Sequence, residues 1–175
     1  MAETGLVIPI DNAEAVVSPW RRFLDPQAAC GVPAHVTVLY PFVDSGRVDD
    51  ALRARLSHVI GAVECFDCCF SGCSWFGENV LWLAPDVPAP FIELTTVLWR
   101  AFPAYPPYGG AHSTVVPHLT VGEAGLVTNR QLRRAEQMLT TALPVTARVD
   151  RALLLAVDYA VGACTTLGEF PLGTP

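Results

Sequence analysis

A short motif occurs on two separate strand-like segments of the chain, and this duplication restricts the possible folds more than any other feature. Residues 34–38 and residues 117–121 both contain a histidine, an apolar residue, a threonine and an apolar residue in that order. The two histidines, His35 and His118, are 83 positions apart, and the segments around them recur at offsets of about 75 to 80. A chain that repeats the same order of segments folds as two similar units packed against each other.

Residues 1–77, the first half, predict three strands separated by two helices. The strands are apolar or alternating runs at 6–10, 35–39 and 65–75. The helices are indicated by apolar residues at helical spacing, the first around Pro19 and the second after a turn at residues 44–46. The apolar residues of the first helix are Val16, Trp20, Phe23 and Leu24, and those of the second are Val48, Leu52, Leu56, Val59, Ile60 and Val63.

Residues 78–175, the second half, run through the same order. Strands are predicted at 79–84 and 118–121, and two further strand candidates follow at 145–157 and 164–172. Two helices are predicted between them, the second opened by a capping box at residues 128–131. Their apolar residues are Phe91, Leu94, Leu98 and Phe102, then Leu132, Ala135, Leu139 and Leu143. We therefore predict one domain over residues 1–175, with pseudo-repeat halves at about 1–77 and 78–175.

The repeated motifs place polar side chains on one face of each strand. Successive residues of a strand point to opposite faces, so His35 and Thr37 share a face, as do His118 and Thr120. Two such strands, related by the repeat, would direct two imidazoles and two hydroxyls at one point. A neutral imidazole accepts a proton, a protonated one delivers a proton, and hydroxyls stabilise charge on phosphate oxygens. This set of groups suits a phosphodiester.

A structural interpretation competes with this site. His35 and His118 are also compatible with hydrogen-bonded histidines on buried strands, but their equivalent positions in two similar units favour a site. A third triplet, His112-Ser113-Thr114, has the same spacing without apolar alternation before it. We assign that triplet to a loop outside the site, and we assign His58 to a partly exposed helix.

The paired strands, with Tyr40-Pro41-Phe42 after the first motif and Pro117 before the second, resemble those of the 2H phosphoesterases. More narrowly, the chain resembles the group of 2′-5′ RNA ligase-like proteins and cyclic phosphodiesterases. The resemblance covers nearly the whole chain, including residues 76–83 and the loop at 105–110. It implies an α+β fold, bilobal and pseudo-duplicated, in which two antiparallel sheets flank a cleft and the helices lie outside.

The resemblance also implies a reaction. It implies metal-independent chemistry, without a cofactor, on a 2′,3′-cyclic or 2′-5′ phosphodiester of a small nucleotide or RNA end. Carried onto this sequence, the catalytic residues are His35, Thr37, His118 and Thr120, which match both motifs without substitution. The two histidines, with ordinary pKa values of about 6.5, would form the general acid–base pair. The alternative is a nucleotide-binding module of the same fold without turnover, and the presence of two titrating groups favours the enzyme.

Aromatic residues near the motifs are candidates for stacking on a nucleobase. We expect Tyr40, Phe76 and Tyr108 to bind substrate. Tyr108 is the strongest candidate, because the pair of glycines after it permits a close or mobile loop beside the second motif. Trp75 and Tyr105 are further candidates. The alternative for each of them is packing in the core or against proline.

The charge of the chain argues against long nucleic acid as a partner. The chain has 11 basic residues against 17 acidic ones, a net charge of −6 at pH 7, and its basic residues are all arginine. Long nucleic acid is held by a basic surface, whereas this chain needs a local site for a phosphate. We therefore expect a monomer that binds a small nucleotide or short oligonucleotide. No leader or membrane segment is predicted, which indicates a cytoplasmic protein.

Four cysteines close together raise the alternative of a zinc site. Cys65, Cys68, Cys69 and Cys73 fall in one strand-like segment, and at strand period Cys68 points away from the other three. Structural zinc sites usually combine two ligand clusters far apart in sequence, and this sequence has no second cluster. We therefore predict buried, reduced thiols and no bound metal.

Overall fold

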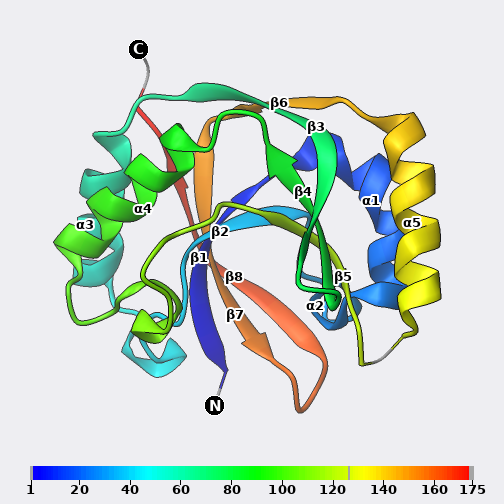
Figure 1. Cartoon of the computed structure of the whole chain (residues 1–175). Helices are drawn as coiled ribbons and strands as arrows, with labels where there is room; N and C mark the ends of the chain where they lie inside the picture. Colours follow the sequence, from blue (N-terminus) through cyan, green and yellow to red (C-terminus); the bar gives the residue numbers. More distant parts are fainter. Residues whose placement is uncertain (1, 126, 174–175) are drawn as a thin grey trace.

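The computed structural model describes residues 2–125 and 127–173, which form two four-stranded antiparallel sheets with helices outside them (Figure 1). The first sheet has the order β2-β1-β7-β8, with β1 at Glu3–Pro9, β2 at His35–Leu39, β7 at Arg151–Asp158 and β8 at Ala163–Pro171. The second has the order β5-β4-β3-β6, with β3 at Phe66–Phe76, β4 at Val80–Pro85, β5 at Leu119–Glu123 and β6 at Val145–Val149. The α+β fold class expected from the sequence is confirmed.

The helices pack in two pairs on the outer sides of the molecule. Helices α3 (Asp50–Gly61) and α4 (Ala89–Ala101) contact β8 and β2 of the first sheet. Helices α1 (Asp11–Leu24) and α5 (Asn129–Ala142) contact β5, β6 and β3 of the second sheet. The short helix α2 (Pro26–Ala29) follows α1. Figure 1 shows the two pairs at opposite sides, with the sheets between them.

Each sheet takes strands from both halves of the sequence. Strand β1 of the first half pairs with β7 from the end of the chain, which places β1, β2, β7 and β8 in one sheet. Strand β3 of the first half pairs with β4 of the second half. Helix α1 likewise packs on the second sheet and α4 on the first. In the orders β2-β1-β7-β8 and β5-β4-β3-β6, each strand of one sheet has a counterpart at the same position in the other. Strands β2 and β5 are therefore edge strands at equivalent positions. These two edge strands contact each other, and they carry the two motifs.

Most predicted elements form, but some details differ from the sequence prediction. Residues 145–157 are not one strand, because Asp150 separates β6 from β7 and the two belong to different sheets. Val48 lies before α3, since Asp49 caps that helix by accepting a hydrogen bond from the Leu52 N–H at 2.8 Å. Phe23 is 70% exposed, so it lies outside the buried side of α1. The capping box of α5 forms as predicted.

A bulge in β3 changes the directions of the cysteine side chains. The register of β3 against β4 shifts between Phe70 and Gly72, which interrupts the alternation of faces. Cys68 is buried, and beyond the bulge Cys73 packs against the same core. The expectation that Cys73 points away from Cys68 is therefore wrong. Burial raises the pKa of each of these two thiols to about 11, which disfavours the thiolate that binds metal.

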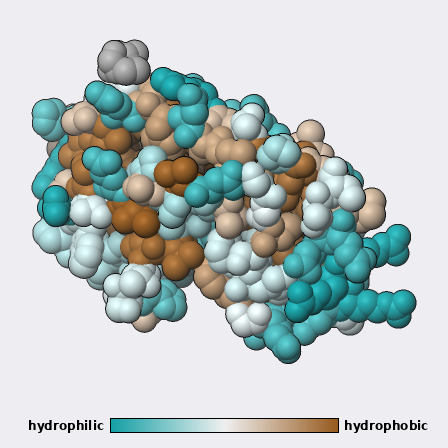
Figure 2. All heavy atoms as spheres, turned by 45° about the horizontal axis from the view of Figure 1, so that its top comes forward, coloured by the Kyte–Doolittle hydropathy of each residue, from teal (hydrophilic) through white to brown (hydrophobic). Residues whose placement is uncertain are grey.

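Within residues 2–125 and 127–173, no group of three or more His, Cys, Asp or Glu side chains could hold a metal ion. In the same residues, no helix has the length and apolar character needed to span a membrane. Figure 2 shows one face of the molecule, on which several separate apolar patches are divided by polar side chains.

Candidate active site

The two motif strands place the four predicted catalytic side chains in one cavity. His35 and Thr37 come from β2, Thr120 comes from β5, and His118 directly precedes β5. All four line a cavity of about 230 Å³ between the two sheets. Because β2 and β5 belong to different sheets, this meeting of side chains depends on how the sheets lie against each other.

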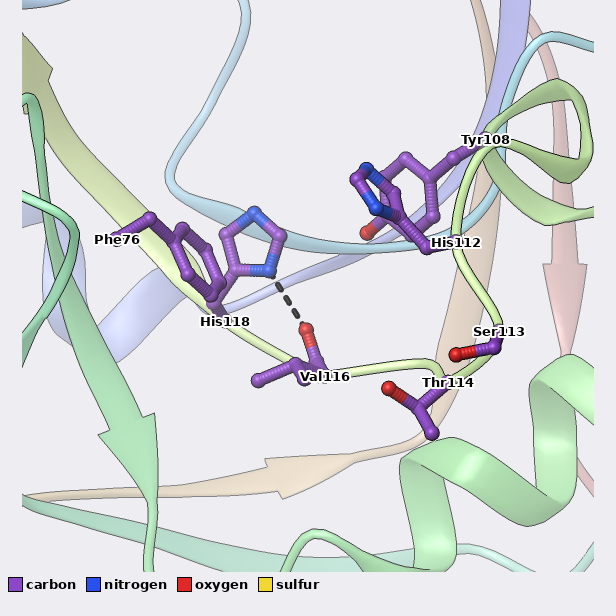
Figure 3. Close-up of a pocket in the computed structure, with 7 residues that line it drawn as sticks. All are labelled: Phe76, Tyr108, His112, Ser113, Thr114, Val116 and His118. Atoms are coloured by element: carbon purple, nitrogen blue, oxygen red, sulfur yellow. Dashed lines mark hydrogen bonds between the residues drawn. The ribbon is translucent and has the colours of Figure 1, made fainter.

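His35 and His118 are held by equivalent hydrogen bonds. Nδ1 of His35 lies 2.7 Å from the carbonyl oxygen of Pro33, and Nδ1 of His118 lies 2.7 Å from that of Val116; Figure 3 shows the second of these bonds. A carbonyl oxygen only accepts, so Nδ1 of each ring carries a proton and donates it. Nε2 of each neutral ring is then the nitrogen left to exchange protons with a ligand.

The pKa values of both imidazoles are lowered. His35 is 8% exposed, and burial together with the nearby Arg21 guanidinium lowers its pKa from 6.5 to about 4. Burial also lowers the pKa of His118, which is less deeply placed. Both shifts favour the neutral imidazole, which corrects the expectation of ordinary pKa values near 6.5.

A buried ion pair that was not predicted from the sequence lies behind the first motif. Arg21 donates to the Asp25 carboxylate at 2.7 Å and to the carbonyl oxygen of Val32 at 3.3 Å, and both charged side chains are 2% exposed. Asp25 also caps α2 by accepting from the Gln27 N–H. The sequence signal for this ion pair was an Arg and an Asp four positions apart at the end of a predicted helix.

Aromatic rings enclose His118 on two sides (Figure 3). The Phe76 ring meets it edge to face with centroids 4.9 Å apart, and the Tyr108 ring lies nearly parallel to it at 6.3 Å. Among the described residues, the buried hydroxyl of Tyr108 has no hydrogen-bond partner. Burial raises the pKa of Tyr108 to about 12, so this hydroxyl keeps its proton at neutral pH.

The other aromatic candidates divide into residues at the cavity and residues away from it. Tyr40 lines the first cavity, and its hydroxyl donates to the Glu3 carboxylate. Trp75 donates instead to Glu136 on α5 at 2.7 Å. Tyr105 packs edge to face against Phe42. Trp75 and Tyr105 are therefore structural residues in this arrangement.

Trp82 is an aromatic neighbour of the site that was not predicted from the sequence. It lies on β4, stacks on Phe76 with centroids 4.7 Å apart and meets His118 at 5.8 Å. It is 7% exposed, and its position beside Thr120 follows from the pairing of β4 with β5. Its place in an apolar strand gave no sign of this contact, because only the pairing with β5 creates it.

The third triplet borders a second cavity, of about 400 Å³, next to the first. This cavity is lined by Phe76, Tyr108, His112, Ser113, Thr114, Val116 and His118 (Figure 3). The triplet does lie in a loop, as predicted, and it lines this second cavity rather than the cavity that holds the four predicted catalytic side chains. The loop folds back over the cavity because Tyr108 has a φ of 53° and the two glycines after it also have positive φ.

Two carboxylates that were not predicted from the sequence lie at the first cavity. Glu3 of β1 and Glu123 at the end of β5 are among its lining residues, together with Tyr159. Burial, with the charge of Asp25, raises the pKa of Glu123. Among the described lining residues of both cavities there is no arginine, so the histidines are the groups there that can become cationic.

Two His-x-Thr strands at equivalent sheet edges, with their side chains in one cavity, are the arrangement that defines the 2H phosphoesterases. The sequence model of the 2′-5′ RNA ligase superfamily matches residues 9–158. The chain belongs to this superfamily.

Solved structures share the fold at low sequence identity. The protein TT0787 of Thermus thermophilus superposes with a TM-score of 0.64 and 16% identity over 99% of each chain. A protein described as a phosphoesterase gives a TM-score of 0.61 and 20% identity, over 99% of this chain and 100% of that one. Escherichia coli LigT complexed with NADP+ gives 0.60 and 18%, over 99% and 98%. A search of curated proteins finds none that matches.

Proposed function

We propose that this protein is a metal-independent phosphodiesterase that acts on a 2′,3′-cyclic or 2′-5′ phosphodiester of a small nucleotide or RNA end. The observation that carries the proposal is the cavity in which His35 and His118 each donate from Nδ1 to a backbone carbonyl, leaving Nε2 for the substrate. Two such nitrogens supply a general base and a general acid without a metal ion. The hydroxyls of Thr37 and Thr120 line the same cavity and would donate to the non-bridging phosphate oxygens.

The unequal surroundings of the two histidines support different roles. His35 lies deepest and has Arg21 nearby, so it stays neutral and is the general base. In hydrolysis, its Nε2 takes a proton from the water molecule that attacks phosphorus. His118, nearer the second cavity, is the general acid, and a bound phosphate anion favours its protonated form. Its Nε2 delivers a proton to the leaving ribose oxygen as the phosphorus–oxygen bond breaks.

The size and charge of the cavities support a small substrate. Volumes of about 230 and 400 Å³ suit a nucleotide or a short oligonucleotide. Glu3 and Glu123 and the net charge of −6 oppose a long polyanion. E. coli LigT, which shares the fold, has been crystallised in complexes with NADP+, 3′-AMP and ATP.

A nucleotide-binding module without turnover is the second candidate. The lowered pKa values of His35 and His118 favour it, because they leave little imidazolium at pH 7 to act as an acid. The two candidates differ in turnover. The test is a panel of 2′,3′-cyclic nucleotides, 2′-5′ dinucleotides and cyclic phosphates of other metabolites, assayed for product with wild-type protein. Turnover of a panel member that is lost in His35→Ala supports the enzyme, whereas nucleotide binding without product supports the module.

A further inference from the structure

We propose that His112, Ser113 and Thr114 bind a second phosphate group of the substrate, separate from the phosphodiester at His35 and His118. The substrate class would then be a nucleotide that carries a terminal phosphate in addition to its scissile bond. This inference rests on the proposed function, because both phosphates belong to one molecule.

The three side chains face a common space. In Figure 3 the hydroxyls of Ser113 and Thr114 and the ring of His112 point from their loop into the second cavity. The loop backbone is held at its start, where the Tyr108 N–H donates to the carbonyl oxygen of Tyr40 at 2.6 Å. The triplet is therefore presented to the cavity by a loop that is fastened beside the first motif.

The chemistry of these side chains fits a phosphate. Two hydroxyls donate hydrogen bonds to phosphate oxygens, and an imidazole donates from either nitrogen when protonated. The remaining described lining of this cavity is aromatic or apolar apart from His118, and it contains no carboxylate. The ring of His112 also lies edge to face with Tyr108 at 5.8 Å, which directs it toward the cavity.

The first cavity carries negative charge, whereas the described lining of the second cavity has no acidic residue. Glu3 and Glu123 line the first cavity, and no arginine among the described lining residues offsets them. A second phosphate in that cavity would be repelled by both carboxylates. An uncharged or hydrogen-bond-donating part of the substrate is the better partner there, so the second phosphate belongs at the His112 end.

One molecule can reach both places. Tyr108 and His118 line both cavities, so the cavities meet beside the second motif. A nucleotide whose scissile phosphate lies at His118 therefore extends directly into the space bordered by His112. A nucleoside bisphosphate has this layout, with one phosphate at the two motifs and the other at the triplet.

The test compares the affinities of adenosine 3′-monophosphate and adenosine 3′,5′-bisphosphate by calorimetry. Wild-type protein is expected to bind the bisphosphate at least tenfold more tightly. This preference should fall below threefold in His112→Ala and in a Ser113→Ala/Thr114→Val double variant. His58→Ala, which removes an exposed imidazole on α3, is the matched control and should keep the full preference.

A ratio of affinities near one in wild-type protein would overturn the inference. So would a preference that survives in His112→Ala and in the double variant, or one that His58→Ala abolishes equally. If the second phosphate instead binds near Glu123, the pattern is reversed. Glu123→Gln then raises the affinity for the bisphosphate, and His112→Ala leaves the preference for the bisphosphate unchanged. The proposed function fails separately, by the absence of turnover, because the affinity ratio requires no catalysis.

Discussion

The rings of Tyr108 and His118 lie nearly parallel, at an interplanar angle of 22° and with centroids 6.3 Å apart, although one residue is on a loop and the other precedes a strand. The Tyr108 N–H donates to the carbonyl oxygen of Tyr40, directly after the first motif strand. The Tyr108 loop therefore bridges the two motifs. A displacement of this loop would change the surroundings of His118 as well as both cavities.

Loss of either histidine should remove most of the turnover. His35→Ala and His118→Ala are each expected to lower kcat by roughly 10²- to 10⁴-fold, the usual effect of losing a general acid or base. Circular dichroism should show the same fold in both variants. His58→Ala should retain the wild-type rate, and it is a better control than His112→Ala, because His112 lines the second cavity. Wild-type rates in both site variants would refute the assignment.

The roles of the two histidines can be separated by the leaving group. A nucleotide p-nitrophenyl phosphodiester has a leaving group that needs no proton, so the general acid becomes dispensable. With this substrate, the rate of His118→Ala should rise to within about tenfold of the wild-type rate, whereas the rate of His35→Ala should stay low. Recovery of His35→Ala instead would reverse the roles.

The pH dependence of kcat/KM follows from the lowered pKa values. The base must be neutral, so activity rises with pH through the pKa of His35, near 4. The acid must be protonated, so activity falls as pH rises through the pKa of His118, which lies below 6.5. We expect a bell-shaped profile with its maximum on the acidic side of neutrality. The two apparent pKa values of its limbs belong to the coupled pair of histidines. Bound phosphate should move the falling limb of kcat to higher pH.

Rates measured from pH 4 to pH 9 provide the check. A profile of kcat/KM that is flat across this range, or variants of His35 and His118 that keep both limbs, would contradict the two-histidine mechanism.

Activity should survive removal of metal ions. In the proposed mechanism the two imidazoles supply both proton transfers, and the raised pKa values of Cys68 and Cys73 disfavour zinc thiolates. After exhaustive dialysis against a chelator, we expect an unchanged kcat and less than about 0.1 equivalent of zinc by elemental analysis. Activity that disappears on chelation and returns with zinc would mean that the cysteines, or other ligands, hold a functional metal.

The buried pair Arg21–Asp25 should be needed for stability. Asp25→Asn leaves the Arg21 guanidinium buried without its counter-charge, which costs about 3 to 5 kcal/mol of unfolding free energy. The matched control is Asp67→Asn, which breaks the exposed pair with Arg148 and should cost less than about 1 kcal/mol. Urea unfolding at pH 7 measures both. Equal losses of unfolding free energy in the two variants would show that the buried pair stabilises the protein no more than the exposed pair does.

The sequence could predict elements that depend on local pattern. The helix capped by Thr128 and Gln131 and the strands that carry His35 and His118 follow from side-chain spacing, which acts over a few residues. It could not predict the break at Asp150 or the bulge after Phe70. Both depend on which strands pair, and pairing is decided by residues far away in the chain.

The candidate site divides in the same way. The sequence by itself determined the two His-x-Thr faces, because the strand period fixes which side chains point together. Only the tertiary structure decided that β3 and the last two strands exchange between halves, bringing β2 and β5 together as edge strands. It also decided the burial of His35, the Arg21 charge behind it and the position of His112 over the second cavity. Burial and electrostatic fields depend on distances in space, and these distances cannot be derived from the spacing of residues along the chain.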